Sequence, residues 1–522
     1  MSFRLTYATM FNPPEEMHER FEKALATVRG RLGRTHAMFI DGKDVPAAST
    51  EERASPIDNQ IKTGRFPHAN PKEVDAAIAA AHRAFPAWRD AGMAKRVTFM
   101  RKVADILEER VYEIAAALVL EVGKNRLEAL GEAQECVDFF RVYADDFEAH
   151  KGYEFELPND PSTVFTSRNR SVMRPYGVWA VIAPFNFPIA LATGPAAAAL
   201  VTGNTVVLKC ASDTPWAGRL LADCIRDAGL PAGVFNYVNG PGAEIGEQLV
   251  RDPRIAGVTF TGSVAVGRAI MAEIAAGRYP RPYIAEMGGK NPTIVTEKAD
   301  LDRAAAGIAR SAYGMGGQKC SALSRLYVHE KVADELLSRI EKEIDKIRIG
   351  DPTERATGLG PVVNKRAHES YARYVSDLKG RGAKIRRGGK QPAEGMFGRG
   401  YYVEPVLAEA DPSDPLWKHE MFLPILMVQR YRDRDEAMRL ANDTDMGLTA
   451  GFYGAPDEVK WFQEGIEAGV TYANRGVGAT TGAWPGYQPF GGWKGSGSSG
   501  KAIASAYYLP LYLREQSRTV VE

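Results

Sequence analysis

The chain has 522 residues, too many for a single hydrophobic core, so we expect two or three domains. Its formal net charge is +1 and no basic run stands out, which argues against a nucleic-acid or membrane surface and favours a small-molecule partner. Four widely spaced cysteines form no CxxC pair and no zinc-ligand cluster, so we expect neither a disulfide framework nor a metal site. Their spacing, and the lack of a secretory signal in residues 1–13, indicate a reducing, cytoplasmic compartment.

The first third of the chain is predominantly helical in pattern. Helical periodicity predicts helices at residues 14–31, 74–90 and 93–122. The stretch 175–208 has no charged residue, but prolines, glycines and asparagines interrupt it, so it does not fit a membrane span. It fits a parallel sheet covered on both faces. Within it we expect a strand at 178–183, a helix at 189–202 and a strand at 205–209.

Strands and helices then alternate in two successive runs, which is typical of doubly wound α/β domains. The first run predicts a helix at 215–228, a strand at 234–238, a helix at 244–251, a strand at 257–260 and a helix at 264–276. The second predicts a strand at 293–295, helices at 301–313, 331–347 and 364–380, a strand at 325–329 and a strand–helix pair at 425–442. We therefore expect two α/β domains of comparable size.

Two segments fit neither domain. Residues 153–174 and 506–522 are rich in charge and in β-forming residues, with little local material to pack against. They predict strands meant for a partner chain. The alternative is a surface hairpin with a loose C-terminal tail.

Three polar residues in Gly- or Pro-rich settings are candidates for catalysis. Cys320 follows Gly316 and Gly317 in a turn, where a thiolate could attack a carbonyl carbon; alternatively it is a small buried core residue. Glu286 could activate water as a general base, or be an ordinary turn carboxylate. Asn186 follows a buried strand, where its amide could stabilise an oxyanion, although a turn asparagine is the simpler interpretation.

A further segment has the pattern of a phosphate site. The sequence from Thr261 to Gly267 places glycines directly after a predicted strand and before a helix N-terminus. It is not the usual GxGxxG fingerprint, and alone it is weak support for a nucleotide site.

Taken together, the motifs resemble the aldehyde dehydrogenase superfamily in order and approximate spacing, over about residues 35–520. They are Asn186, Lys209, Gly262–Gly267, Glu286, Cys320, Glu420–Phe422 and Pro489–Gly492. The resemblance implies that Cys320 is the nucleophile, Glu286 the general base and Asn186 an oxyanion donor. It also implies NAD or NADP as coenzyme, with the coenzyme held by Lys209, Gly262, Ser263, Gly267, Glu420 and Phe422.

Two positions depart from the family pattern. Ser212 stands where a ribose-binding glutamate is common, and the lack of a carboxylate there leaves NADP possible beside NAD. Leu423 stands where a glycine commonly follows the phenylalanine, and the sequence offers no functional reason for it.

Within the superfamily the chain most resembles the glutamate-semialdehyde (1-pyrroline-5-carboxylate) dehydrogenases. The resemblance implies that Ser321, Gly482 and Ala483 bind the substrate carboxylate, and that Phe187 and Phe490 sandwich its aliphatic stem. About three extra residues within 477–480, and Trp484–Pro485 in place of a small aliphatic pair, leave another semialdehyde or an aromatic or aliphatic aldehyde open. An esterase, or a non-catalytic protein on the same scaffold, are rival classes.

The resemblance also implies a domain division. We expect residues 1–152 and 175–285 to form a coenzyme-binding domain and residues 286–495 a catalytic domain. Residues 153–174 and 496–522 would form an oligomerisation arm that joins the sheet of a neighbouring subunit. A homodimer or a larger assembly of dimers is expected.

Overall fold

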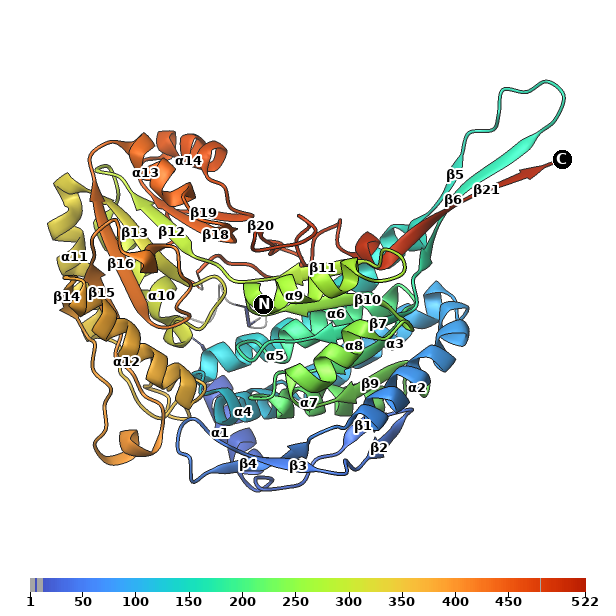
Figure 1. Ribbon diagram of the computed structural model, residues 1–522, viewed down its shortest axis with the longest axis horizontal. Coiled ribbons are helices and arrows are strands. Elements are labelled where there is room, and N and C mark those ends of the chain that lie inside the picture. The colour runs from blue at the N-terminus through green and yellow to red at the C-terminus, as the bar shows by residue number, and fades with distance from the viewer. Residues whose placement is uncertain (1–4, 7–12, 479) are drawn as a thin grey trace.

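The computed structural model describes residues 5–6, 13–478 and 480–522, and has two α/β halves with a projecting arm (Figure 1). The first seven-stranded sheet has the order β11-β10-β7-β8-β9-β1-β2, and its strands β7 to β11 are parallel. The bounds are β1 (Met38–Ile40), β2 (Lys43–Val45), β7 (Val178–Ile182), β8 (Thr205–Lys209), β9 (Phe235–Val238), β10 (Ile255–Thr261) and β11 (Tyr283–Glu286). β8 is fully buried and β7 nearly so, which explains the uncharged stretch 175–208, because both faces of the sheet are covered.

Helices surround this sheet much as predicted. They are α1 (Glu15–Arg29), α2 (Pro71–Arg89), α3 (Met93–Glu109), α4 (Val111–Val122), α5 (Arg126–Ala149), α6 (Ala190–Val201), α7 (Pro215–Ala228), α8 (Glu247–Arg251) and α9 (Val264–Ala275). The single helix expected at 93–122 is wrong: Arg110, with φ −103° and ψ 5°, breaks it into α3 and α4. The helix expected at 244–251 begins as a π-helical turn at Gly242–Gly246.

The second sheet has the order β14-β15-β16-β13-β12-β18-β19, with only the edge strand β14 antiparallel. The bounds are β12 (Asn291–Val295), β13 (Leu323–His329), β14 (Lys384–Arg387), β15 (Val406–Glu409), β16 (Ile425–Tyr431), β18 (Thr449–Tyr453) and β19 (Val470–Ala473). Its helices are α10 (Leu301–Tyr313), α11 (Glu330–Asp345), α12 (Lys365–Gly380), α13 (Arg434–Asn442) and α14 (Val459–Gly465). Two separate two-stranded sheets pair β3 (Thr50–Ala54) with β4 (Lys62–Pro67) and β17 (Met446–Gly447) with β20 (Trp493–Lys494).

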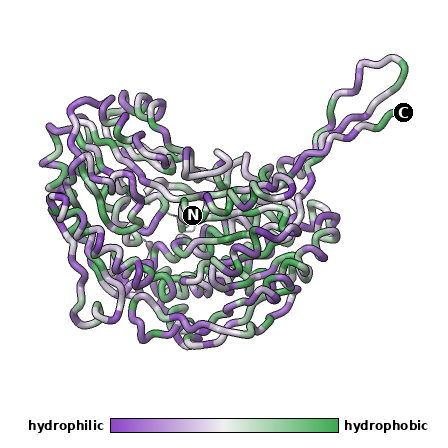
Figure 2. The backbone as a smooth tube through the Cα atoms, in the orientation of Figure 1, coloured by the Kyte–Doolittle hydropathy of each residue, from purple (hydrophilic) through white to green (hydrophobic). Residues whose placement is uncertain are grey.

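The arm is a three-stranded antiparallel sheet of order β21-β6-β5, formed by β5 (Glu154–Leu157), β6 (Ser167–Pro175) and β21 (Leu513–Val521). It therefore combines the two segments that fitted neither domain. It projects from the body with the C-terminus at its end (Figure 1). Hydrophobic stretches lie along it beside hydrophilic ones (Figure 2), and Phe155 and Val520 are more than half exposed.

The two sheets meet where β11 ends. Residues 287–290 carry the chain from β11 in the first sheet to β12 in the second, and Cys320 lies just before β13. The junction therefore collects the carboxyl ends of first-sheet strands and the loops of the second sheet. No helix in the described part of the chain is long and apolar enough to cross a membrane. The residues tested for a secretory signal, 1–13, fall mostly outside the described ranges.

Candidate active site

Cys320 is presented by a sharp left-handed turn after α10. Met315, Gly316 and Gly317 have φ values of 52°, 63° and 68°, a conformation that glycine adopts without steric strain. A Cβ on Gly317 would lie 2.3 Å from the carbonyl oxygen of Leu423, so this glycine is also required by close packing. The Cys320 carbonyl accepts a 2.7 Å hydrogen bond from Asn291 Nδ2. The backbone around the thiol is therefore fixed from both sides.

Glu286, the last residue of β11, lies against this thiol. Burial raises the pKa of Glu286 to about 7, and a hydrogen bond with Cys320 acts in the opposite direction. Burial raises the pKa of the Cys320 thiol well above its usual value, and the nearby Glu286 carboxylate raises it further. Glu286 Oε1 has no hydrogen-bond partner among the described residues. A carboxyl group that ionises near neutral pH beside a thiol is suited to accept a proton.

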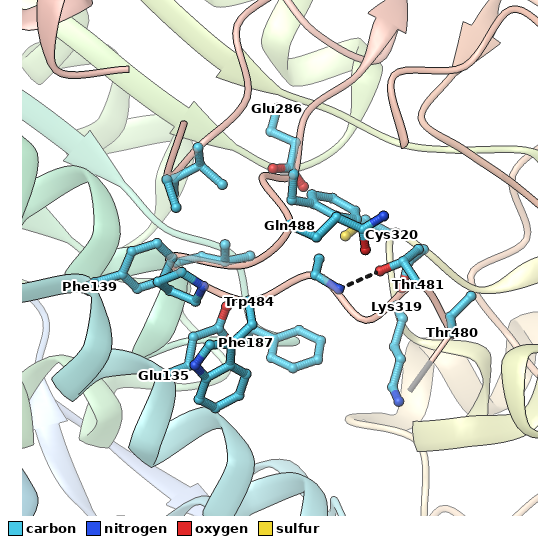
Figure 3. A pocket seen from close by; sticks show the side chains of 17 residues that line it. Glu135, Phe139, Phe187, Glu286, Lys319, Cys320, Thr480, Thr481, Trp484 and Gln488 are labelled. Atoms are coloured by element: carbon cyan, nitrogen blue, oxygen red, sulfur yellow. Dashed lines mark hydrogen bonds between the residues drawn. The ribbon is translucent and has the colours of Figure 1, made fainter. Parts of the chain in front are cut away.

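Cys320 and Glu286 line one cavity together with several predicted substrate residues (Figure 3). Ser321, Ala483, Phe187 and Phe490 belong to its wall. The remaining described lining residues are Glu135, Phe139, Leu191, Lys319, Thr480, Thr481, Trp484, Pro485, Gln488, Ile503 and Ala504. The wall is mostly apolar and aromatic, with a few polar groups, as is usual for small-molecule sites.

Two predicted residues do not belong to the described lining. Asn186 is only 3% exposed in the loop between β7 and α6, next to Phe187. Gly482 has φ +86°, and a Cβ there would meet the Arg475 guanidinium at 2.5 Å. The Ala483 N–H donates to Thr481 Oγ1 at 3.1 Å, so this predicted carboxylate donor already has an acceptor.

Coenzyme candidates lie around the start of α9. Ser263 caps α9, and its Oγ accepts from the Val266 N–H, which leaves other first-turn N–H groups without helical partners. A Cβ on Gly262 would lie 2.6 Å from the Phe260 ring, and a Cβ on Gly267 2.4 Å from Met287 Sδ. Glycine is therefore needed for the tight strand-to-helix turn, which fits a pyrophosphate at the helix N-terminus.

Three further side chains fit the ribose and nicotinamide roles in different ways. Lys209 is buried at the end of β8, and burial lowers its pKa to about 8. The Glu420 carboxylate accepts from the Gly289 N–H at 2.8 Å. Phe422, with φ 56°, packs edge-on against Phe185.

Ser212 is half-buried and donates to the Gly240 carbonyl at 3.2 Å. Leu423 is 6% exposed in the core of the second domain, so packing accounts for this departure from the family.

Sequence reasoning missed the helix behind the cavity. Residues 126–149 form α5, and Glu135 and Phe139 of this helix line the cavity. Phe187 packs under Lys124, whose Nζ lies 4.1 Å from the ring centroid and is paired with buried Glu132. Acidic residues at helical spacing were the available signal in the sequence.

These features together define a thiol-dependent aldehyde-oxidising site on a coenzyme-binding α/β scaffold. The sequence matches the aldehyde dehydrogenase family over residues 45–517, and the chain belongs to that family. A 1-pyrroline-5-carboxylate dehydrogenase of Geobacillus sp. (strain WCH70) is 37% identical, with 97% of each chain covered. The 1-pyrroline-5-carboxylate dehydrogenase 2 of Bacillus subtilis (strain 168) is 36% identical, with 97% of this chain and 96% of the relative covered. The solved structure of 1-pyrroline-5-carboxylate dehydrogenase from Thermus, with bound NAD, superposes with a TM-score of 0.93 at 34% identity, covering 100% of this chain and 99% of that one.

Proposed function

We propose that the protein oxidises L-glutamate γ-semialdehyde, the open form of 1-pyrroline-5-carboxylate, to L-glutamate with NAD(P), in proline degradation. The observation that carries the proposal is the contact between Cys320 and Glu286 in a cavity lined by Phe187 and Phe490. The names of the similar proteins point to the same substrate. A non-catalytic protein would have no need for both a nucleophile and a base at one site.

The chemistry follows from the position of the proton acceptor. Glu286 takes the proton of the Cys320 thiol, and the thiolate attacks the aldehyde carbon to form a thiohemiacetal. The Cys320 N–H and the Asn186 amide stabilise the oxyanion. A bound coenzyme would supply the hydride acceptor, and loss of hydride from the adduct leaves a thioester on Cys320. Glu286 first releases the thiol proton to solvent and, ionised again, takes a proton from the water that hydrolyses the thioester. Its transfer of that proton to the departing thiolate restores the thiol as the acid is released.

The residues present fit NAD(P). The first-turn N–H groups of α9 that the Ser263 cap leaves without partners, and the close-packed Gly262 and Gly267, suit the pyrophosphate. Lys209 and the Glu420 carboxylate, which the Gly289 N–H orients, would hold the two riboses, and Phe422 would flank the nicotinamide. Ser212 in place of a carboxylate leaves room for the 2′-phosphate of NADP, so both coenzymes are accommodated.

An amino-acid semialdehyde fits the remaining wall. Phe187 and Phe490 provide the apolar surface for its aliphatic stem. The Ser321 hydroxyl, with backbone N–H groups at Gly482 and Ala483, would receive the carboxylate, the Ala483 N–H exchanging its Thr481 acceptor for the substrate. Glu135 offers a carboxylate for the α-ammonium group.

A second candidate substrate is an aromatic aldehyde. Trp484 and Phe139 add two aromatic rings to the cavity wall, and both could stack on a ring. The part of the lengthened loop at Ala479 lies outside the described residues, while its neighbour Thr480 lines the cavity.

We also propose the domain division and the assembly expected from the sequence. The coenzyme and catalytic domains follow the two sheets, with residues 1–152 and 175–285 against 286–495. The arm, with exposed Phe155 and Leu157 on edge strand β5, would add to the sheet of a second copy. All four cysteines are free, which supports a cytoplasmic location.

Steady-state NADH formation tests the substrate. L-Glutamate γ-semialdehyde should exceed succinate semialdehyde, hexanal and benzaldehyde in kcat/KM by about tenfold or more, or roughly 1.4 kcal/mol of transition-state discrimination. A preference for benzaldehyde would contradict the glutamate assignment and favour the aromatic candidate. Incubation of the aldehyde without coenzyme should yield no acid, because the oxidation needs a hydride acceptor. A pure esterase would hydrolyse an ester but would form no NADH with any of these aldehydes.

A further inference from the structure

One face of α5 carries four carboxylates that reach different parts of the active site. They are Glu128, Glu132, Glu135 and Asp138, and spacings of four, three and three residues place them on one side of a helix. Glu128 pairs with Lys319, the residue before Cys320, at 2.8 Å. Glu132 accepts from the N–H groups of Ile189 and Ala190 at the start of α6. The last carboxylate of this face contacts the substrate loop.

That contact is a buried hydrogen bond from Trp484 Nε1 to Asp138 Oδ2, 2.6 Å long. Trp484 is 3% exposed and Asp138 is 1% exposed. A buried indole N–H without an acceptor is unfavourable, because the donor has lost its hydrogen bonds to water. Asp138 therefore fixes both the position and the rotation of the indole ring.

The backbone of Trp484 is fixed as well. Its carbonyl accepts from the Tyr487 N–H at 3.0 Å, and its N–H donates to the Gln488 carbonyl at 3.1 Å. Pro485 followed by Gly486, which has φ +82°, is the pattern of a type II turn. A Pro-Gly turn restricts the backbone, so this wall of the cavity is rigid.

Trp484 lies away from the reacting groups. In Figure 3, Trp484, Phe139 and Glu135 gather on one side of the cavity, and Glu286 and Cys320 on the other. The cavity reaches from Cys320 to Trp484, so a long aldehyde bound with its carbonyl carbon at Cys320 would meet the indole. We propose that Trp484, held by Asp138, is a specificity-determining wall that limits the length of the aldehyde, and that Asp138 is a positioning residue. The proposal rests on the proposed aldehyde oxidation, but not on glutamate semialdehyde as the substrate.

The test is a chain-length profile of kcat/KM for NAD-dependent oxidation of butanal, hexanal and octanal. Trp484→Ala should raise the octanal-to-butanal ratio by about tenfold or more, the range that a few methylene groups contribute in a hydrophobic pocket. Asp138→Leu should raise it in the same direction, because the indole loses its acceptor. Asp138→Asn keeps an acceptor oxygen and should restore the wild-type ratio within about twofold. Val477→Ala, 67% exposed on the same loop, is the control and should leave the ratio unchanged.

Folding is monitored by circular dichroism and by the butanal rate, and Trp484→Phe, which keeps an aromatic ring, serves as a second variant if Trp484→Ala does not fold. It should shift the ratio in the same direction, since the N–H anchor is lost. An unchanged ratio in a folded Trp484→Ala or Trp484→Phe protein overturns the proposal. A shift in Asp138→Asn as large as in Asp138→Leu overturns the role of Asp138. If the wild type oxidises these aldehydes but not L-glutamate γ-semialdehyde, the substrate assignment fails. The octanal-to-butanal ratio of the variants then still tests the role of Trp484.

Discussion

The pKa of Glu286 predicts how turnover depends on pH. Burial raises this pKa from 4.5 to about 7. A general base acts only when ionised, so thioester hydrolysis should accelerate as pH rises through 7. About one tenth of the carboxyl groups are ionised at pH 6 and about nine tenths at pH 8, so the hydrolysis-limited rate should rise by roughly tenfold over this interval. Glu286→Gln should remove this dependence and lower turnover by roughly 10²-fold or more.

The raised pKa of Glu286 also makes the stability of the folded protein depend on pH. The pKa of the folded state lies above that of the unfolded state, so the native protein holds this proton more tightly. The stabilisation is complete below pH 4.5 and is lost as pH rises from 4.5 to about 7. At 1.36 kcal/mol per pKa unit the loss approaches about 3 kcal/mol. Glu286→Gln should therefore gain stability relative to the wild type over this pH window.

Stopped-flow measurement of NADH formation separates the two chemical steps. In Glu286→Gln a burst of about one NADH per active site should precede slow hydrolysis, because the variant still forms the thioester. Glu286→Gln also removes the carboxylate that raises the pKa of the Cys320 thiol, so the burst is measured at about pH 9 or above, where hydroxide can deprotonate the thiol. Glu19→Gln, exposed on α1, is the matched control. A full tenfold rise between pH 6 and 8 in Glu286→Gln, or rapid hydrolysis after the burst, would refute the role of Glu286.

Three further changes have defined outcomes. Asn186→Ala should lower kcat by about 10²–10³ through loss of an oxyanion donor, and a steady-state kcat within fivefold of wild type would contradict that role. Ser212→Glu should reduce the NADP-to-NAD ratio of kcat/KM by about tenfold, because a carboxylate repels the 2′-phosphate; coenzyme titrations check this, and an unchanged ratio places Ser212 away from the ribose. Lys290→Met should raise the free energy of unfolding at pH 7 by at least about 1 kcal/mol. Burial lowers the pKa of Lys290 to about 7, so the gain in unfolding free energy should shrink as pH rises toward 10.5. Denaturant unfolding at several pH values measures this gain, and a gain that does not change with pH would contradict the prediction.

The parallel sheets were predictable because local sequence and tertiary environment agree there. β8, α7 and α10 match the predicted ranges 205–209, 215–228 and 301–313. α5 was missed because its buried face includes Glu128, Glu132 and Asp138, which interrupt the apolar stripe that marks an amphipathic helix. These charges are tolerated inside because each has a partner in a distant loop, and the sequence pattern does not show such partners.

The candidate site likewise contains residues that short sequence motifs predict and contacts that only the fold reveals. Cys320 and Glu286 lie in short Gly-rich motifs whose order along the chain is informative, and the structure brings the two side chains into contact. The hydrogen bond between Ala483 N–H and Thr481 is local but depends on the loop conformation. Trp484 and Asp138 are 346 residues apart, so only the fold reveals that they meet. The chemistry was therefore predictable from the sequence, whereas the shape of the substrate wall was not.

The position of α5 links catalysis to substrate selection. Lys319 precedes Cys320 and pairs with Glu128, Phe187 lies under the Lys124–Glu132 pair, and Trp484 donates a hydrogen bond to Asp138. Removing one partner of a buried ion pair typically destabilises a protein by about 3–5 kcal/mol. A shift of α5 would displace the turn that carries Cys320, the Phe187 ring and the Trp484 side of the cavity together. We therefore expect the cavity to keep one geometry as long as this helix is in place, and Val477→Ala, at an exposed position, to leave it unchanged.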